Sequence, residues 1–185
     1  MDPRKKQPYH KSTLSDHPEY AQAIGLITVE MVNMETYLGD LLGSLLHISR
    51  QMGRIVYLTP KSAFTRLEIL ENVSTATLAK DTQARKDVDR LLGRAKSVMG
   101  KRHCLIHESW GVNEINTNEV MRASLPHSKS KPATPVKLED LKSLIIDIRN
   151  VMHDAVEITD DSYSVWPPYT SKPTNRGRLV ADHAK

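Results

Sequence analysis

The chain has 185 residues, of which 39% are hydrophobic and 26% charged, a composition ordinary for one globular domain with a substantial core. No apolar stretch approaches the roughly 18 residues of a membrane span, and no apolar segment follows the charged residues 1–8, so we expect neither a membrane helix nor a signal peptide. Cys104 is the only cysteine, which excludes an internal disulfide and favours the reducing cytoplasm, and the net charge of +4 is compatible with nucleic-acid binding without demonstrating it.

The N-terminal part of the chain is predicted to be an arm followed by a long helix. Residues 1–15 are polar and basic and contain proline, which predicts a flexible basic arm. The segment 16–19 (DHPE) has the acidic cap and early proline of a helix start. Apolar residues then recur every three or four positions over 24–45, which predicts a helix of about seven turns, long enough for a bundle or a dimer seam.

Shorter helices are predicted to follow. The segment 49–58 has helical spacing of its apolar residues, and Thr59-Pro60 then has the form of a cap with proline at the first helical position. The helix that begins at Thr59-Pro60 is expected to continue to about Lys80. Asp81-Thr82 is expected to cap the next one.

This next helix has an arginine inside its apolar stripe. The stripe steps by 4, 3, 4, 3 and 4 positions through Val88, Leu92, Ala95, Met99, Arg102 and Ile106. Burying a lone guanidinium is unfavourable, so Arg102 needs an anionic partner, water or a cleft. Glu35 lies at the edge of the stripe of the first helix, where it could pair with Arg102 across the bundle and hold it in place. The alternative is that Glu35 is a boundary carboxylate in solvent.

A small hairpin and a last helix complete the predicted elements. Trp110-Gly111 is expected to end the helix that carries Arg102. Short alternating runs over 112–115 and 119–123 predict a β-hairpin. The segment 125–135 is rich in Ser, Lys and Pro, as loops are, and helical spacing returns over 138–155.

The predicted fold is mainly α, an antiparallel helical bundle of four to five helices with a small β-hairpin before the last helix. The bundle domain is predicted over 16–160. The polar, proline-containing segment 161–185 is predicted to be an extended or disordered tail.

Arg102, His103 and His107 form the cluster that can carry chemistry. The two histidines are four residues apart, so they share a helix face. An imidazole can act as acid or base near neutral pH, and a guanidinium can hold a phosphate through paired donors. These parts suffice to cleave RNA without a metal, because the histidine takes the proton of a ribose 2′-hydroxyl and the arginine stabilises charge on the phosphorus oxygens.

An arginine followed by four residues and a histidine, late in a long helix of a helical bundle, resembles the HEPN superfamily. The segment 106–111 (IHESWG) resembles the His-x-x-Trp ending of a bacterial branch of such proteins. The resemblance implies a homodimer whose motifs face a shared cleft. For many members it also implies metal-independent endoribonuclease activity, without a cofactor, in toxin–antitoxin or other defence systems. It places Arg102 and His107 at the catalytic positions, while His103 stands where a small polar residue such as Asn is common.

Three residues are predicted to support the site. His103 could bond to phosphate. Lys101 lies on one side of the helix with Arg90 and Arg94, where the three could track an RNA backbone, although a solvated face is the default interpretation. Trp110 is expected to be an aromatic lid on the core, with base stacking as the alternative.

Two questions about the site stay open at the level of sequence. Residues five apart on an ideal helix are separated by about 140°, so a long side chain, a bent helix end or a second subunit must bring Arg102 and His107 together. His103 and His107 also have the spacing of two zinc ligands, with Cys104 or Glu108 nearby, but Arg102 would repel a cation and we expect no metal. Cys104 as a nucleophile is a weaker alternative, since a lone helical cysteine is more often inert.

The sequence therefore predicts a metal-independent ribonuclease or RNase-like toxin that binds RNA, with an antitoxin or another protein as a further partner. The alternative is a non-catalytic helical dimer that uses the same cleft to bind nucleotide, RNA or a protein.

Overall fold

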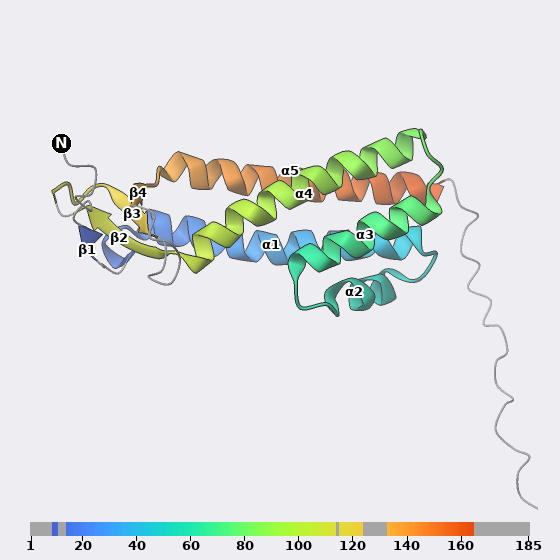
Figure 1. The fold of residues 1–185 in the computed structure, drawn as a ribbon, viewed down its shortest axis with the longest axis horizontal. Helices are drawn as coiled ribbons and strands as arrows, with labels where there is room; N and C mark the ends of the chain where they lie inside the picture. The colour runs from blue at the N-terminus through green and yellow to red at the C-terminus, as the bar shows by residue number, and fades with distance from the viewer. Residues whose placement is uncertain (1–8, 11–13, 114, 124–132, 165–185) are drawn as a thin grey trace, which may run out of the picture.

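The computed structural model describes residues 9–10, 14–113, 115–123 and 133–164, which form an elongated bundle of helices with a small sheet at one end (Figure 1). This part of the chain contains five α-helices: α1 (Pro18–Leu45), α2 (Arg50–Leu58), α3 (Ala63–Thr77), α4 (Gln83–His107) and α5 (Leu138–Ser164). The prediction of a mainly helical bundle with a small β element before the last helix is confirmed.

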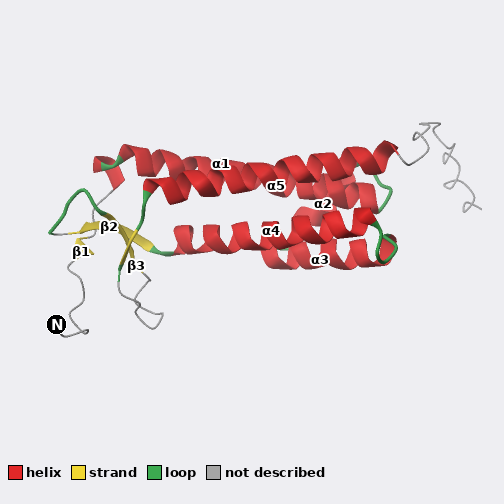
Figure 2. Cartoon of the chain, turned by 90° about the horizontal axis from the view of Figure 1, so that it is seen from above, coloured by secondary structure: helices red, strands yellow, loops and turns green. Residues whose placement is uncertain are grey.

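The helices are arranged as two layers. Figure 2 shows α1 beside α5 in one layer and α3 beside α4 in the other. Helices α1 and α5 both begin near the sheet and run in the same direction, whereas α4 runs back toward the sheet (Figure 1). Only Glu108 separates the last residue of α4, His107, from the first residue of β2, Ser109, so α4 ends beside the sheet.

The apolar stripes predicted from the sequence form the core. In α1, the side chains of Ile27, Met34, Leu38 and Leu41 are at most 1% exposed. The stripes of α4 and α5 pack against them through Val88, Leu92, Ala95, Met99, Leu141, Ile145 and Ile148, which are all buried. Removal of this apolar surface from water is the main stabilisation of the bundle.

Two helices begin later than the sequence predicts. The N-cap of α1 is His17, with Pro18 at the first helical position, so Asp16 is not the cap. The N-cap of α3 is Ser62, whose hydroxyl accepts a hydrogen bond from the Thr65 amide, rather than Thr59. Thr59 instead continues the turn that ends α2, because its amide donates to the Ile55 carbonyl.

Glycines let α2 pack tightly on the C-terminal half of α1. A Cβ atom added to Gly53 would lie 2.5 Å from the Gly39 carbonyl oxygen and 2.5 Å from the Gly43 Cα atom. Next to this contact, Arg54 donates two hydrogen bonds to the buried carboxylate of Asp40, at 2.6 and 2.8 Å. The close approach and the paired charges fix α2, and with it the segment that leads into α3.

The sheet has four antiparallel strands in the order β1 (Tyr9–His10), β2 (Ser109–Asn113), β3 (Val120–Ala123) and β4 (Thr134–Pro135). The predicted hairpin is present as β2 and β3. However, α4 ends at His107, and Trp110-Gly111 lies inside β2 instead of ending the helix. Trp110 Nε1 donates to the Leu105 carbonyl at 2.9 Å, so the strand provides a donor for the end of the helix.

The chain ends differ in part from the sequence prediction. Of the predicted flexible arm, residues 9–10 form β1 and Leu14–Asp16 form a 3-10 helix, while 1–8 and 11–13 lie outside the described residues. Helix α5 continues to Ser164, four residues into the segment predicted as a tail, and 165–185 lie outside the described residues. Among the described helices, none combines the length and the apolar character that crossing a membrane requires.

Candidate functional site

The predicted cluster of Arg102, His103 and His107 borders a pocket of about 420 Å³. All three come from the last two turns of α4. Glu35 of α1 and the segment at the start of α3, including Lys61 and Phe64, form other parts of the wall. The buried side chains of Met31 and Met99 also border it, which places the pocket directly on the core.

Arg102 differs from the other arginines that the structure describes. Each of those forms an ion pair with a carboxylate: Arg50, Arg54, Arg66, Arg85, Arg90, Arg94, Arg122 and Arg149. Arg102 forms no such pair with any described residue. Its Nε atom is buried and has no hydrogen-bond partner there. A partly buried cation without a partner favours a ligand that brings an anion.

The possible ion pair between Glu35 and Arg102 is not formed. Glu35 Oε1 instead accepts a hydrogen bond from Arg66 Nη1 at 2.7 Å, and the Nε atom of Arg66 donates to the Pro60 carbonyl at 2.7 Å. The carboxylate and the guanidinium are 18% and 17% exposed. Glu35 still borders the same pocket as Arg102, but its charge is already compensated by Arg66.

Behind this pair lies Tyr57 of α2, which is completely buried. Its hydroxyl has no hydrogen-bond partner among the described residues. Burial raises the pKa of Tyr57 above its usual range. The negative charge of Glu35 raises the pKa further, whereas the positive charge of Arg66 lowers it. The three side chains therefore form a partly desolvated group beside the pocket.

His103 and His107 lie against each other at the mouth of the pocket. Their ring centroids are 4.4 Å apart and the ring planes are inclined by 45°. Both side chains are exposed, so water and ligands can reach them. The expectation that the two imidazoles share a helix face is confirmed. Two adjacent imidazoles can provide a proton acceptor and a proton donor at one place.

A single chain brings Arg102 and His107 to the same pocket. The two residues are five apart on a helix that continues to His107, so they leave it in directions that differ by about 140°. Both nevertheless border the same space between α4, α1 and the start of α3. The sequence left three explanations open for how Arg102 and His107 meet: a long side chain, a bent helix end or a second subunit. Because one chain brings both residues to this pocket, a second subunit is not required.

The structure separates Lys101 and Trp110 from this pocket. Lys101 Nζ donates to Asp147 of α5 at 2.8 Å. It borders a second pocket, of about 460 Å³, on another side of α4. Trp110 lies in β2 and is not part of the wall of the first pocket. Of the three predicted supporting residues, His103 borders the pocket of Arg102, whereas Lys101 and Trp110 do not.

The basic face of α4 that was considered for RNA binding is compensated by carboxylates. Arg90 pairs with Asp87, and Arg94 pairs with Asp154 of α5. Together with the pairing of Lys101, these contacts favour the default interpretation of a solvated face.

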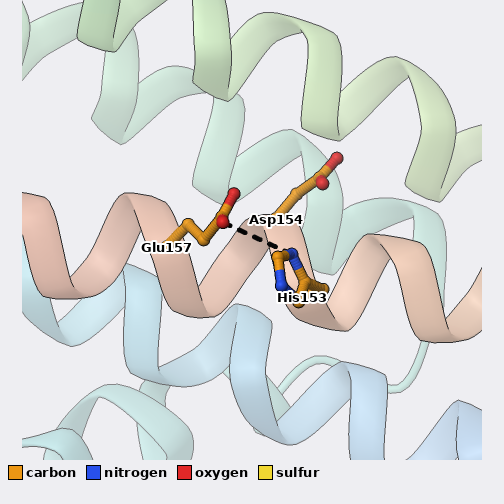
Figure 3. Close-up of side chains that lie close together, drawn as sticks. All are labelled: His153, Asp154 and Glu157. Atoms are coloured by element: carbon orange, nitrogen blue, oxygen red, sulfur yellow. Dashed lines mark ion pairs between the residues drawn. The ribbon is translucent and has the colours of Figure 1, made fainter.

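Glu108 and Cys104, the possible further metal ligands beside His103 and His107, lie elsewhere. Glu108 Oε2 pairs with Arg122 Nε at 2.6 Å, and Cys104 borders the second pocket. In the described part of the chain, the one group with metal-ligand spacing is His153, Asp154 and Glu157 on α5 (Figure 3). Its Asp154 is already paired with Arg94, and a neighbouring guanidinium disfavours a bound cation.

Sequence reasoning missed Lys61, Phe64, Arg66 and Tyr57. Periodicity identifies which face of a helix is buried, but it gives no contacts between helices, so it contains no signal for the pairing of Arg66 with Glu35. The one available signal was composition, because Phe64 is the only phenylalanine in the chain.

The pocket has a positive charge. Among the described residues, three cations, Lys61, Arg66 and Arg102, border it together with one carboxylate, Glu35. No protein-family model, curated protein or solved structure matches this chain. Its function is therefore inferred from the chemistry of this pocket.

Proposed function

We propose that this protein is a metal-independent endoribonuclease that binds the phosphodiester of RNA in the pocket of Arg102, His103 and His107. The observation that carries this proposal is the guanidinium of Arg102, which has no carboxylate partner among the described residues and borders the same pocket as two adjacent imidazoles. An unpaired, partly desolvated cation beside proton-transfer groups is the arrangement that phosphoryl chemistry requires.

Arg102 is the phosphate-binding residue in this proposal. A guanidinium presents parallel N–H donors that match two oxygens of a phosphate, and the bond is strengthened where water is partly excluded. Lys61 adds a second cation that forms no ion pair with a described carboxylate, and Arg66 is engaged by Glu35. The excess of positive charge in the pocket favours the polyanionic backbone of RNA over neutral ligands.

The proton transfers of the reaction need no group beyond the substrate and the two imidazoles, while Arg102 holds the phosphate. A neutral imidazole takes the proton of the ribose 2′-hydroxyl, and the resulting oxygen attacks the adjacent phosphorus. The bond from phosphorus to the 5′-oxygen breaks, and that oxygen takes a proton from a protonated imidazole. The products are a 2′,3′-cyclic phosphate and a 5′-hydroxyl. His107 acts as base or acid, and His103 is positioned for the complementary role.

The resemblance to the HEPN superfamily extends the proposal to a homodimer and to a role in toxin–antitoxin or other defence systems, with an antitoxin or another protein as partner. Light scattering on the purified chain measures the oligomeric state directly. A monomer at working concentrations would overturn the dimer without affecting the proposed chemistry, since one chain provides both Arg102 and His107.

The test is RNA cleavage in the presence of EDTA. Mixed single-stranded RNAs are incubated with the wild-type protein, His107→Ala and the control His153→Ala, which removes an exposed histidine of α5 outside the pocket. We expect cleavage by the wild type and by His153→Ala, cyclic phosphate ends, and a loss of at least about 100-fold in His107→Ala. Binding without cleavage by the wild type would overturn the nuclease in favour of a non-catalytic RNA-binding protein.

A further inference from the structure

Phe64 is a half-exposed aromatic side chain at the edge of the pocket. It lies in the first turn of α3, is 47% exposed, and borders the pocket that contains Arg102. Two other large apolar residues that border the pocket, Met31 and Met99, are buried in the core, whereas Phe64 lies outside it. Exposing a large aromatic surface costs solvation free energy, so its position beside a cationic pocket calls for a ligand with a flat apolar surface.

The pocket has two chemically different parts. Arg102 and Lys61 provide positive charge, while Phe64 and Val32, the latter 61% exposed, provide apolar surface at its edge. A nucleotide has the same division, with a charged phosphate joined through a sugar to a flat base. The pocket volume of about 420 Å³ is in the range for one ligand of this size and is too small for a duplex.

We propose that Phe64 is the stacking platform for the base of an unpaired nucleotide whose phosphate lies on Arg102, so that the substrate is single-stranded RNA. The choice of RNA rests on the proposed function. The inference that Phe64 stacks on a base is supported independently by the exposure of its ring and by the positive charge of the pocket. Every base has a π-face, so this contact tolerates all four bases, whereas bases in a duplex are already stacked and cannot reach the ring.

The test is equilibrium binding in EDTA, measured by fluorescence anisotropy with oligonucleotides that carry 2′-O-methyl riboses and cannot be cleaved. Wild-type protein, Phe64→Leu and Phe64→Trp are titrated with a single strand, the matching duplex and a strand with abasic positions. Leucine keeps apolar bulk but lacks the π-face, and tryptophan keeps the π-face. Ile146→Ala is the control, because Ile146 is an apolar residue of α5 that is 57% exposed and lies outside the pocket.

We expect Phe64→Leu to weaken binding of the single strand about five- to tenfold, and Phe64→Trp and Ile146→Ala to bind as the wild type does. The difference between wild type and Phe64→Leu should disappear with the abasic strand. Equal binding of single strand and duplex, or an equal loss with the abasic strand, would overturn the stacking role. Thermal unfolding of each variant shows whether α3 is intact.

Competition with a nucleoside monophosphate separates a free nucleotide from an RNA strand as the ligand. Displacement at concentrations similar to those of the strand would overturn the assignment to RNA. The binding measurement is also independent of cleavage. Phe64-dependent binding without cleavage keeps this inference and overturns the nuclease, whereas cleavage that is unaffected in Phe64→Leu overturns this inference alone.

Discussion

Glu35 accepts a hydrogen bond from Arg66 at 2.7 Å, and this pairing across α1 and α3 leaves Arg102 without a carboxylate in the described part of the chain. Both arginines border the same pocket as Glu35, so the choice of partner determines which guanidinium can bind a ligand. Arg66 is fixed further by its bond to the Pro60 carbonyl. The pairing thus keeps Glu35 from neutralising the cation that the proposed chemistry requires.

Replacing Arg66 should therefore weaken RNA binding through Glu35. In Arg66→Gln the carboxylate loses its partner and is free to compensate Arg102, so we expect about a tenfold rise in Kd for a non-cleavable single strand. In the double variant Glu35→Gln/Arg66→Gln the net charge of the pocket returns to the wild-type value, and affinity should recover. Anisotropy titrations measure both. A double variant as weak as Arg66→Gln would show that Arg66 itself contacts the RNA.

Tyr57 should make the protein sensitive to alkaline pH. Burial and Glu35 raise the pKa of Tyr57 in the folded state above the value of about 10 in the unfolded chain. The folded state therefore holds the phenolic proton more tightly. The resulting stability is fully present below pH 10 and is lost as the pH rises above 10.

Tyr57→Phe removes this titration and also the buried hydroxyl without a described partner. We expect the free energy of unfolding at pH 7 to rise by up to about 1 kcal/mol, and the decrease above pH 10 to be smaller than in the wild type. Urea unfolding at pH 7, 9 and 11 provides the comparison. Parallel pH dependences of the two proteins would contradict this account of Tyr57.

The contact between α1 and α2 should not tolerate a methyl group at Gly53. The added Cβ would meet the backbone of Gly39 and Gly43 at 2.5 Å, so α2 must move. We expect Gly53→Ala to lower the free energy of unfolding by about 2 kcal/mol or more. Gly93→Ala is the matched control in α4, where nothing lies within 4 Å of the added atom, and it should raise stability by about 0.5–1 kcal/mol. Similar effects of the two substitutions in denaturant unfolding would refute the close contact.

Lys61 and Lys101 should differ in their effect on the salt dependence of RNA binding. Lys61 borders the pocket, whereas Lys101 is paired with Asp147 outside it. We expect Lys61→Met to reduce the slope of log Kd against log salt by about one, and Lys101→Met to leave it unchanged. The slopes come from titrations between about 50 and 200 mM salt. A reduced slope only in Lys101→Met would place the RNA on the other side of α4.

The long helices and the proximity of Arg102, His103 and His107 were predictable because their signals are local. The spacing of apolar residues over α1, α4 and α5 follows from which face of each helix is buried, and Arg102 was visible as an interruption of that spacing. The spacing of His103 and His107 likewise fixed their contact.

The remaining features depend on how separate elements meet. The partner of Glu35 is decided by the packing of α3 on α1, and the turn before Ser62 sets where Phe64 lies. The two-residue strands β1 and β4 are held by pairing with β2 and β3, so their own sequences contain no periodic signal.

Arg102 and His107 are proposed to act together on one phosphodiester, and RNA cleavage in EDTA by the single and double variants tests this directly. We predict that Arg102→Ala and His107→Ala each lose at least about 100-fold in cleavage rate. The double variant should lose no more than the less active of the two single variants, because the effects of residues in one catalytic unit do not add. Losses that multiply, or single variants that cleave at the wild-type rate, would contradict a joint role for the two residues.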